Sequence, residues 1–177
     1  MKIRSNHTDL LELNLAILFI STSGVLGRSI DLPVPVVIFF RALVAGIVLF
    51  LFAKVKGFSF KIARKNSVGL IVGGAFLGIH WVTYFYALKL SNVAIGMLSL
   101  YTFPTITAVL EPILLKKKFE TVHLVMGLIV LVGIYLLAPD VDVENQYFVG
   151  MCLGVISAVF FSLRNIMLKS RADDNQS

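Results

Sequence analysis

Residues 66–88 read NSVGLIVGGAFLGIHWVTYFYAL, a run of 23 residues without aspartate, glutamate, lysine or arginine. A second run, residues 90–110, is 21 residues long and equally free of these charges. About 20 apolar residues, each rising about 1.5 Å, cross a hydrocarbon core of roughly 30 Å. Both runs therefore predict helices that span a membrane.

The whole chain has the same apolar character. Of its 177 residues, 58% are hydrophobic and 15% are charged, whereas soluble domains are about 45–50% apolar and about 25% charged. A globule of this size hides only about 70% of the surface that its chain exposes, so it could not bury so much apolar surface. The composition argues against a soluble enzyme, a disordered chain and a disulfide scaffold, and the single cysteine, Cys152, has no partner within the chain.

Six spans follow from the charge-free stretches. We expect helices at residues 13–30, 33–53, 67–88, 93–115, 121–139 and 147–168. Of the 16 basic and 10 acidic residues, only four fall inside these spans: Arg28, Arg41, Glu111 and Arg164. The fold class predicted is an all-α, polytopic transmembrane helix bundle.

The basic residues gather at alternate connections. Twelve of the 16 precede the first span, join the second to the third or the fourth to the fifth, or follow the sixth. Because cytoplasmic loops carry an excess of lysine and arginine, we expect a multi-pass protein of the inner cell membrane with both termini cytoplasmic. This pattern also argues against a nucleic-acid partner, the other interpretation of a basic excess.

The sixth expected span resembles the first. Ile20-Ser21 followed by Arg28-x-Ile30 recurs 136 residues later as Ile156-Ser157 followed by Arg164-x-Ile166. Because the copies start five spans apart, the second would begin on the opposite side of the membrane, as in the inverted repeats of secondary carriers. The expected organisation is a cytoplasmic N-terminus (1–12), a five-helix repeat (13–139), the first helix of a second repeat (147–168) and a cytoplasmic tail (169–177).

Three short stretches carry a family resemblance: FRAL at 40–43, WVTYFYALK at 81–89 and YTFP at 101–104. In their order and spacing, residues 33–139 resemble the repeat of the EamA-like carriers of the drug/metabolite transporter superfamily. One departure is Lys116-Lys117, which stand where such carriers usually have a glycine and a glutamate. The resemblance implies a secondary carrier of a small organic metabolite or drug that works by alternating access.

Carriers of this family usually have ten spans, and six are expected here. The alternative function is therefore an inactive truncated fragment, or an accessory membrane subunit that needs the missing helices. The expected partners are a small-molecule substrate, membrane lipid, and either a second copy of the chain or second-half helices.

Polar side chains of different spans fall at one depth. Counted from the outer ends, Arg41, His80 and Tyr101 lie eight or nine residues in, about 12–14 Å deep. Other polar residues and a proline lie within about a turn of that layer: Ser21, Thr22, Ser23, Trp81, Tyr84, Thr102, Pro104, Thr105 and Ser157. Such a layer suits a substrate cavity near the midplane. The predicted substrate-binding residues are Arg41, Trp81, Tyr84, Tyr101 and Thr102.

Arg41 is the most informative member of this layer. A charge at the centre of a membrane helix costs about 2.5–3.5 kcal/mol on insertion scales, so it should face a partner or water. Its function would be to hold an anionic group such as a substrate carboxylate. Alternatively, it snorkels to the outer interface, bridges backbone carbonyls or pairs with missing helices.

Other candidates carry two interpretations each. Pro104 frees the Leu100 carbonyl and could kink a gate, although passive helices also contain kinks. Glu111 could be a gate or a proton-binding carboxylate, or it could form an interfacial ion pair with residues 116–118. His80 could relay protons or simply hydrogen-bond a neighbour, and Trp81 and Tyr84 could also be packing aromatics.

No catalytic or metal-binding constellation is recognisable in the sequence. The three histidines, His7, His80 and His123, belong to different segments at different depths. No glycine-rich phosphate loop and no nucleophile paired with a base is recognisable. We therefore expect neither enzymatic activity nor a cofactor or metal ion.

Overall fold

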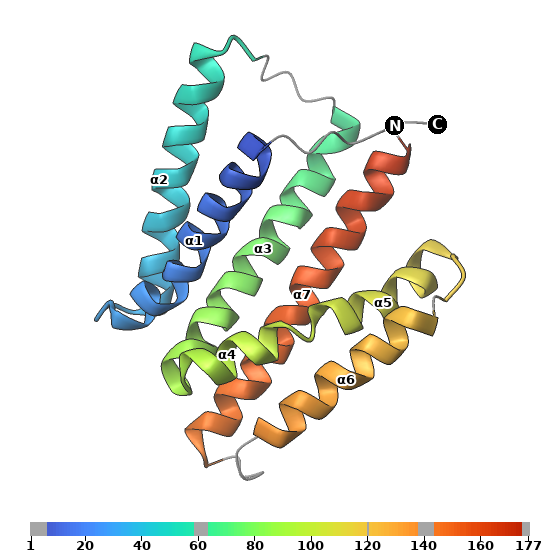
Figure 1. The fold of residues 1–177 in the computed structure, drawn as a ribbon. Coiled ribbons are helices and arrows are strands. Elements are labelled where there is room, and N and C mark those ends of the chain that lie inside the picture. The colour runs from blue at the N-terminus through green and yellow to red at the C-terminus, as the bar shows by residue number, and fades with distance from the viewer. Residues whose placement is uncertain (1–6, 59–63, 120, 138–143, 175–177) are drawn as a thin grey trace.

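The computed structural model describes residues 7–58, 64–119, 121–137 and 144–174, and across these ranges it contains helices and short connections without strands (Figure 1). The helices are α1 (His7–Ser29), α2 (Val34–Val55), α3 (Arg64–Leu90), α4 (Val93–Leu100), α5 (Phe103–Leu115), α6 (Thr121–Leu137) and α7 (Gln146–Asp174). The all-α helix bundle is confirmed. Three residues expected on the inner side, Lys2, Arg4 and Lys61, lie outside the described residues.

Four spans are long and apolar enough to cross a membrane. They are Val34–Val55 of α2, Ser67–Leu90 of α3, Val93–Leu115 across α4 and α5, and Gln146–Arg171 of α7. The chain is therefore an integral membrane protein. The first and fifth expected spans correspond to α1 and α6, whose membrane crossing stays a prediction; α1 starts at His7 rather than at residue 13.

The outer helices expose large apolar side chains. Phe39 and Leu49 of α2 are 62% and 66% exposed, and Ile129 of α6 is 66% exposed. A soluble monomer rarely shows apolar patches larger than a few hundred Å². Large apolar side chains on the outside of a bundle are typical of helices whose outer faces contact lipid acyl chains.

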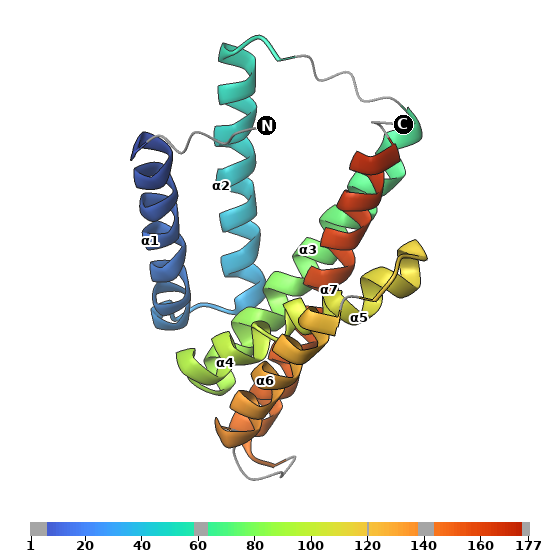
Figure 2. The ribbon, with the colours of Figure 1, turned by 45° about the vertical axis from the view of Figure 1, so that its right-hand side comes forward.

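The centre of the bundle is α7, which packs on α3, α4 and α5 and makes its most extensive contact with α3 (Figures 1 and 2). Glycines permit this close approach. A β-carbon at Gly154 would lie 2.5 Å from the Ser99 Cβ, and one at Gly150 would lie 3.0 Å from the Ala87 carbonyl oxygen. The small-x3-small pattern at 150–154 thus serves helix packing, whereas Gly74 and Gly78 have nothing within 4 Å of an added β-carbon.

Substitution of Gly154 with alanine should destabilise the bundle. Its new methyl group would overpack the α4–α7 contact, at a cost of roughly 1–3 kcal/mol. Gly74→Ala is the matched control, because the same methyl group meets open space there and alanine is the better helix former. The measurement is the midpoint of thermal unfolding in detergent, which should fall for Gly154→Ala only.

The expected span at 93–115 is one stretch of membrane-spanning length, and it is interrupted at residues 101–102, next to the proline for which a kink was predicted. α4 ends at Leu100, and α5 starts at Phe103 with Pro104 in its first turn. Proline has no N–H to donate and fits the first turn of a helix, so a new helix begins at this point. Two polar contacts form here within the protein: the Thr102 hydroxyl donates to the Ser99 carbonyl at 2.7 Å, and the Ser162 hydroxyl donates to the Phe103 carbonyl at 3.0 Å. The buried Thr105 hydroxyl has no hydrogen-bond partner among the described residues.

α1 and α2 form an arm that meets the rest of the bundle mainly near one end (Figure 2). The buried Val34 and Ile38 of α2 pack with Phe85 of α3, and beyond these first turns α2 diverges from α3. At the same end, the Lys89 ammonium donates to the Leu32 carbonyl at 2.6 Å. That contact fixes the α1–α2 connection to the end of α3 and leaves space between the arm and the bundle.

Candidate functional site

A pocket of about 310 Å³ lies beside the α4–α5 break, where α1, α2, α3 and α7 also contribute side chains. Its lining residues are Ile17, Ser21, Arg41, His80, Trp81, Tyr84, Phe85, Met97, Leu100, Tyr101, Phe103 and Phe161. Four of the five residues predicted to bind substrate are among them. Of the twelve residues of the expected layer, six line this pocket: Ser21, Arg41, His80, Trp81, Tyr84 and Tyr101.

Arg41 is the cation of this pocket. It is the eighth residue of α2, about 10 Å along the helix from Val34. Its guanidinium carbon lies 4.6 Å from the centroid of the Trp81 ring and 5.6 Å from that of Phe85. An arginine over aromatic rings gains cation–π attraction and still offers N–H groups in a planar fork. The arrangement can hold a carboxylate or phosphate at the depth of the pocket.

His80 is fixed at the back of the pocket by a hydrogen-bonded pair with Ser157 of α7. The Ser157 hydroxyl donates to the His80 carbonyl oxygen at 2.9 Å, and His80 Nδ1 lies 2.8 Å from that hydroxyl oxygen and 3.2 Å from the Ser157 carbonyl oxygen. The hydroxyl has one proton and donates it to the His80 carbonyl, so its oxygen can only accept a hydrogen bond from the ring. This geometry favours the His80 tautomer that is protonated on Nδ1. Of the two interpretations of His80, this contact matches the one in which the ring hydrogen-bonds a neighbour.

Replacing Ser157 with alanine should therefore destabilise the fold. Ser157 is fully buried, and its loss leaves polar groups of His80 with fewer partners, which costs about 1–3 kcal/mol. In the control, Ser29→Ala, the exposed hydroxyl only donates to the Val25 carbonyl of its own helix. Thermal unfolding in detergent should distinguish them, and equal midpoints for the two variants would contradict a structural role of the His80–Ser157 pair.

Aromatic side chains form the walls of the pocket. Tyr84 is half-buried and stacks on His80 at a centroid distance of 6.2 Å, and Tyr101, 50% exposed, follows the last residue of α4. Phe161 of α7 lies 4.7 Å from the His80 ring and was not predicted. Its one signal in the sequence is a position four residues after Ser157, which places both on the same face of a helix.

Two predicted residues lie next to the pocket without lining it. Thr102 is 2% exposed, with its hydroxyl donated to the Ser99 carbonyl. Pro104 is exposed in the first turn of α5. Both belong to the helix break, so their position fits a hinge better than direct contact with a ligand.

Glu111 lies elsewhere, in a polar hollow of about 280 Å³ at the other end of α5. Its carboxylate forms an ion pair with Lys169 of α7. Lys117, Lys118 and His123 line the same hollow. An ion pair, one of the two expected roles, therefore exists, but its partner comes from a helix distant in the sequence. The pair joins α5 to α7.

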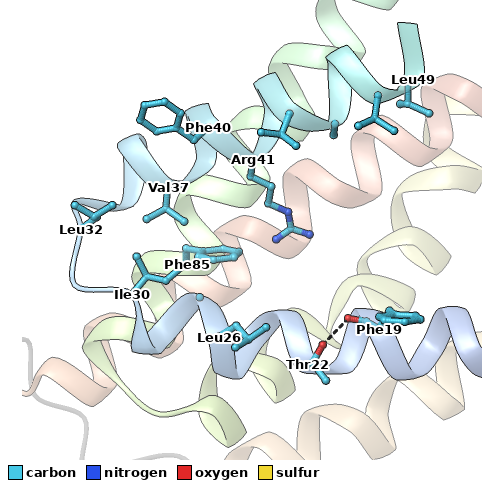
Figure 3. A pocket seen from close by; sticks show the side chains of 14 residues that line it. Phe19, Thr22, Leu26, Ile30, Leu32, Val37, Phe40, Arg41, Leu49 and Phe85 are labelled. Carbon is cyan, nitrogen blue, oxygen red and sulfur yellow. Dashed lines mark hydrogen bonds between the residues drawn. The ribbon is translucent and has the colours of Figure 1, made fainter. Parts of the chain in front are cut away.

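A third and larger hollow, of about 1060 Å³, separates α1 from α2 (Figure 3). Its lining is almost wholly apolar, and it shares Arg41 and Phe85 with the smaller pocket. In Figure 3 the Arg41 side chain extends from α2 toward α1 into this space. Within the described residues, no group of three or more metal-ligand side chains comes together.

Four apolar stretches of membrane-spanning length define a polytopic integral membrane protein. The model of the EamA-like transporter family matches residues 10–138, so the chain belongs to this family. The resemblance inferred for residues 33–139 is confirmed and extends to α1.

Two relatives, each named an uncharacterized transporter, come from Helicobacter pylori strains J99 and 26695. Both are 28% identical over 137 residues, which cover 75% of this chain and 44% of the relative. The chain therefore matches less than half the length of these relatives. No solved structure matches the chain.

Proposed function

We propose that the protein is a secondary carrier that moves a small organic molecule with an anionic group across the membrane by alternating access. The observation that carries this proposal is the Arg41 guanidinium, held 4.6 Å from the Trp81 ring in a pocket among membrane helices. An arginine over aromatic rings still offers N–H groups to an anion, so an anionic substrate would bind there with charge-assisted hydrogen bonds. The protein would act without chemistry on its cargo.

Each pocket residue has a role in this proposal. Arg41 binds the anionic moiety with charge-assisted hydrogen bonds. Trp81, Tyr84 and Tyr101 shape the space around the rest of the substrate and can stack on it or hydrogen-bond to it. His80 takes part through its ring, with Nε2 as the acceptor nitrogen if the transport step moves a proton.

The gate in this proposal is the break between α4 and α5. Leu100, Tyr101 and Phe103 line the pocket from both sides of the break, and Pro104 prevents the helix from closing across it. Discontinuous helices next to the substrate are a recurring feature of secondary carriers. Movement of α5 relative to α7 would make or break the ion pair of Glu111.

The proposed location is an inner cell membrane with both termini cytoplasmic. In Figure 1, α1 begins and α7 ends at the same end of the bundle, as this orientation requires. The exposed apolar faces of α1 and α2 would meet lipid, a second copy of the chain or second-half helices.

Transport by the purified chain tests the proposal. Vesicles containing the protein would be loaded with an unlabelled mixture of organic anions, and the exchange of labelled organic anions and cations would be followed. Uptake of anions above that of empty vesicles supports a carrier. If no compound exchanges although the protein is inserted, the alternative holds, that the chain is inactive without further helices.

A further inference from the structure

Arg41 stands at the junction of two hollows with different chemistry. On one side is the pocket with His80, Tyr84 and Tyr101, of about 310 Å³. On the other is the hollow between α1 and α2, of about 1060 Å³. Arg41 and Phe85 line both, so a ligand anchored on the guanidinium could extend from one into the other.

The larger hollow offers little to a polar group. Besides Arg41, the residues that line this hollow include one with a polar side chain, Thr22. The Thr22 hydroxyl donates to the Phe19 carbonyl at 2.8 Å (Figure 3). The other lining side chains belong to leucine, isoleucine, valine, alanine and phenylalanine, with one glycine. Such a surface accepts methylene groups and rejects charged or hydrogen-bonding ones.

The length of the hollow limits the length of the apolar chain that a ligand can place in it. Along α2 it follows the helix from Arg41 to Leu49, eight residues, or about 12 Å. A lipid acyl chain could enter this space, but its headgroup stays at the interface and would bring no anion to the depth of Arg41. An amphipathic anion matches both the guanidinium and the apolar lining: its charged head can contact Arg41 while its chain lies along the apolar side chains.

We infer that the substrates of this carrier are amphipathic monoanions, with a carboxylate or similar head on Arg41 and an apolar chain between α1 and α2. The inference rests on the proposed function and names its substrate class. It predicts that affinity rises with chain length, by up to about fourfold for each methylene that leaves water. It also predicts that the same chain with a cationic or neutral head binds poorly.

Trp81 provides the signal for the test. It is the single tryptophan of the chain, and its ring lies 4.6 Å from the Arg41 guanidinium. The purified full-length chain, in nanodiscs of neutral phospholipid, would be titrated with octanoate, acetate, octylammonium and octanol while tryptophan emission is followed. We expect a saturable change with octanoate at concentrations at least tenfold lower than with acetate, and none with octylammonium or octanol.

Two matched pairs of variants locate the ligand. Arg41→Gln should remove the response to octanoate, whereas Arg28→Gln, which changes an arginine outside both hollows, should keep it. Ala45→Phe places a ring in the hollow and should weaken octanoate at least fivefold without affecting acetate. Ala42→Phe, on the same helix but outside the lining, is its control. If Ala45→Phe aggregates, Ala45→Leu replaces it.

The possible failures are distinguishable. If octanoate and acetate respond equally and both need Arg41, the inferred substrate class is wrong while the anion site of the proposed function survives. If Arg41→Gln responds like the native chain, the anion site itself is wrong. A response to octylammonium or octanol equal to that of octanoate shows partition into the bilayer and overturns the inference.

Discussion

Replacement of Arg41 with alanine is expected to abolish transport while leaving the protein inserted and folded. A charge-assisted hydrogen bond contributes about 1.5–3 kcal/mol, which corresponds to roughly tenfold to more than a hundredfold in affinity for an anion. The fold should tolerate the change, because Arg41 is exposed and the buried contacts of α2 are those of Val34 and Ile38. The measurement is uptake of labelled anions into vesicles that contain equal amounts of protein.

Two further variants show whether the loss comes from binding. Arg41→Lys keeps the charge but loses the planar fork, so it should retain only part of the uptake. Arg28→Ala removes an exposed arginine near the end of α1 and should leave uptake within twofold of the native rate. Native uptake by Arg41→Ala would remove Arg41 from the binding site.

The depth of the polar layer could be predicted because a membrane helix is regular. Counting residues from the expected outer ends placed Arg41, His80 and Tyr101 at one level, and all three line the same pocket. The count needed only a fixed rise per residue and spans of similar length. Their contribution to binding is a separate matter, and it stays a prediction.

Contacts between distant helices could not be predicted in this way. Neither the position of Phe161 against His80 nor the pairing of Glu111 with Lys169 follows from the spacing of residues within one helix. Both depend on how α7 packs in the centre of the bundle. The break at residues 101–102 had a local signal in Pro104, but a kinked helix and two separate helices fit that signal equally well.

The internal similarity of α1 and α7 has a structural counterpart. The two helices run in opposite directions (Figure 1), as an inverted repeat requires. Ser21 of α1 lines the pocket, and its equivalent Ser157 of α7 holds His80, which lines the same pocket. Helices five spans apart run in opposite directions in any bundle of alternating helices, so the inverted-repeat interpretation stays a prediction.

Reversal of the charge at Glu111 is expected to have the second large effect. Glu111→Lys would place a fourth ammonium group in a hollow already lined by Lys117, Lys118 and Lys169. Because Glu111 is 20% exposed and Lys169 is 52% exposed, the cost should be about 2 kcal/mol, between the values of exposed and buried pairs. We expect a lower midpoint of thermal unfolding in detergent and at least a tenfold loss of uptake in vesicles.

The double variant Glu111→Lys/Lys169→Glu should recover most of both properties, because it restores one acid and one base between α5 and α7. If neither the unfolding midpoint nor the uptake recovers, the direct pair is not the origin of the loss.

Glu111→Gln separates a structural pair from a gate, since it removes the attraction without adding repulsion. A merely structural pair would change uptake only as far as it changes stability. If the pair must form and break as α5 moves against α7, uptake should change severalfold at an unchanged unfolding midpoint.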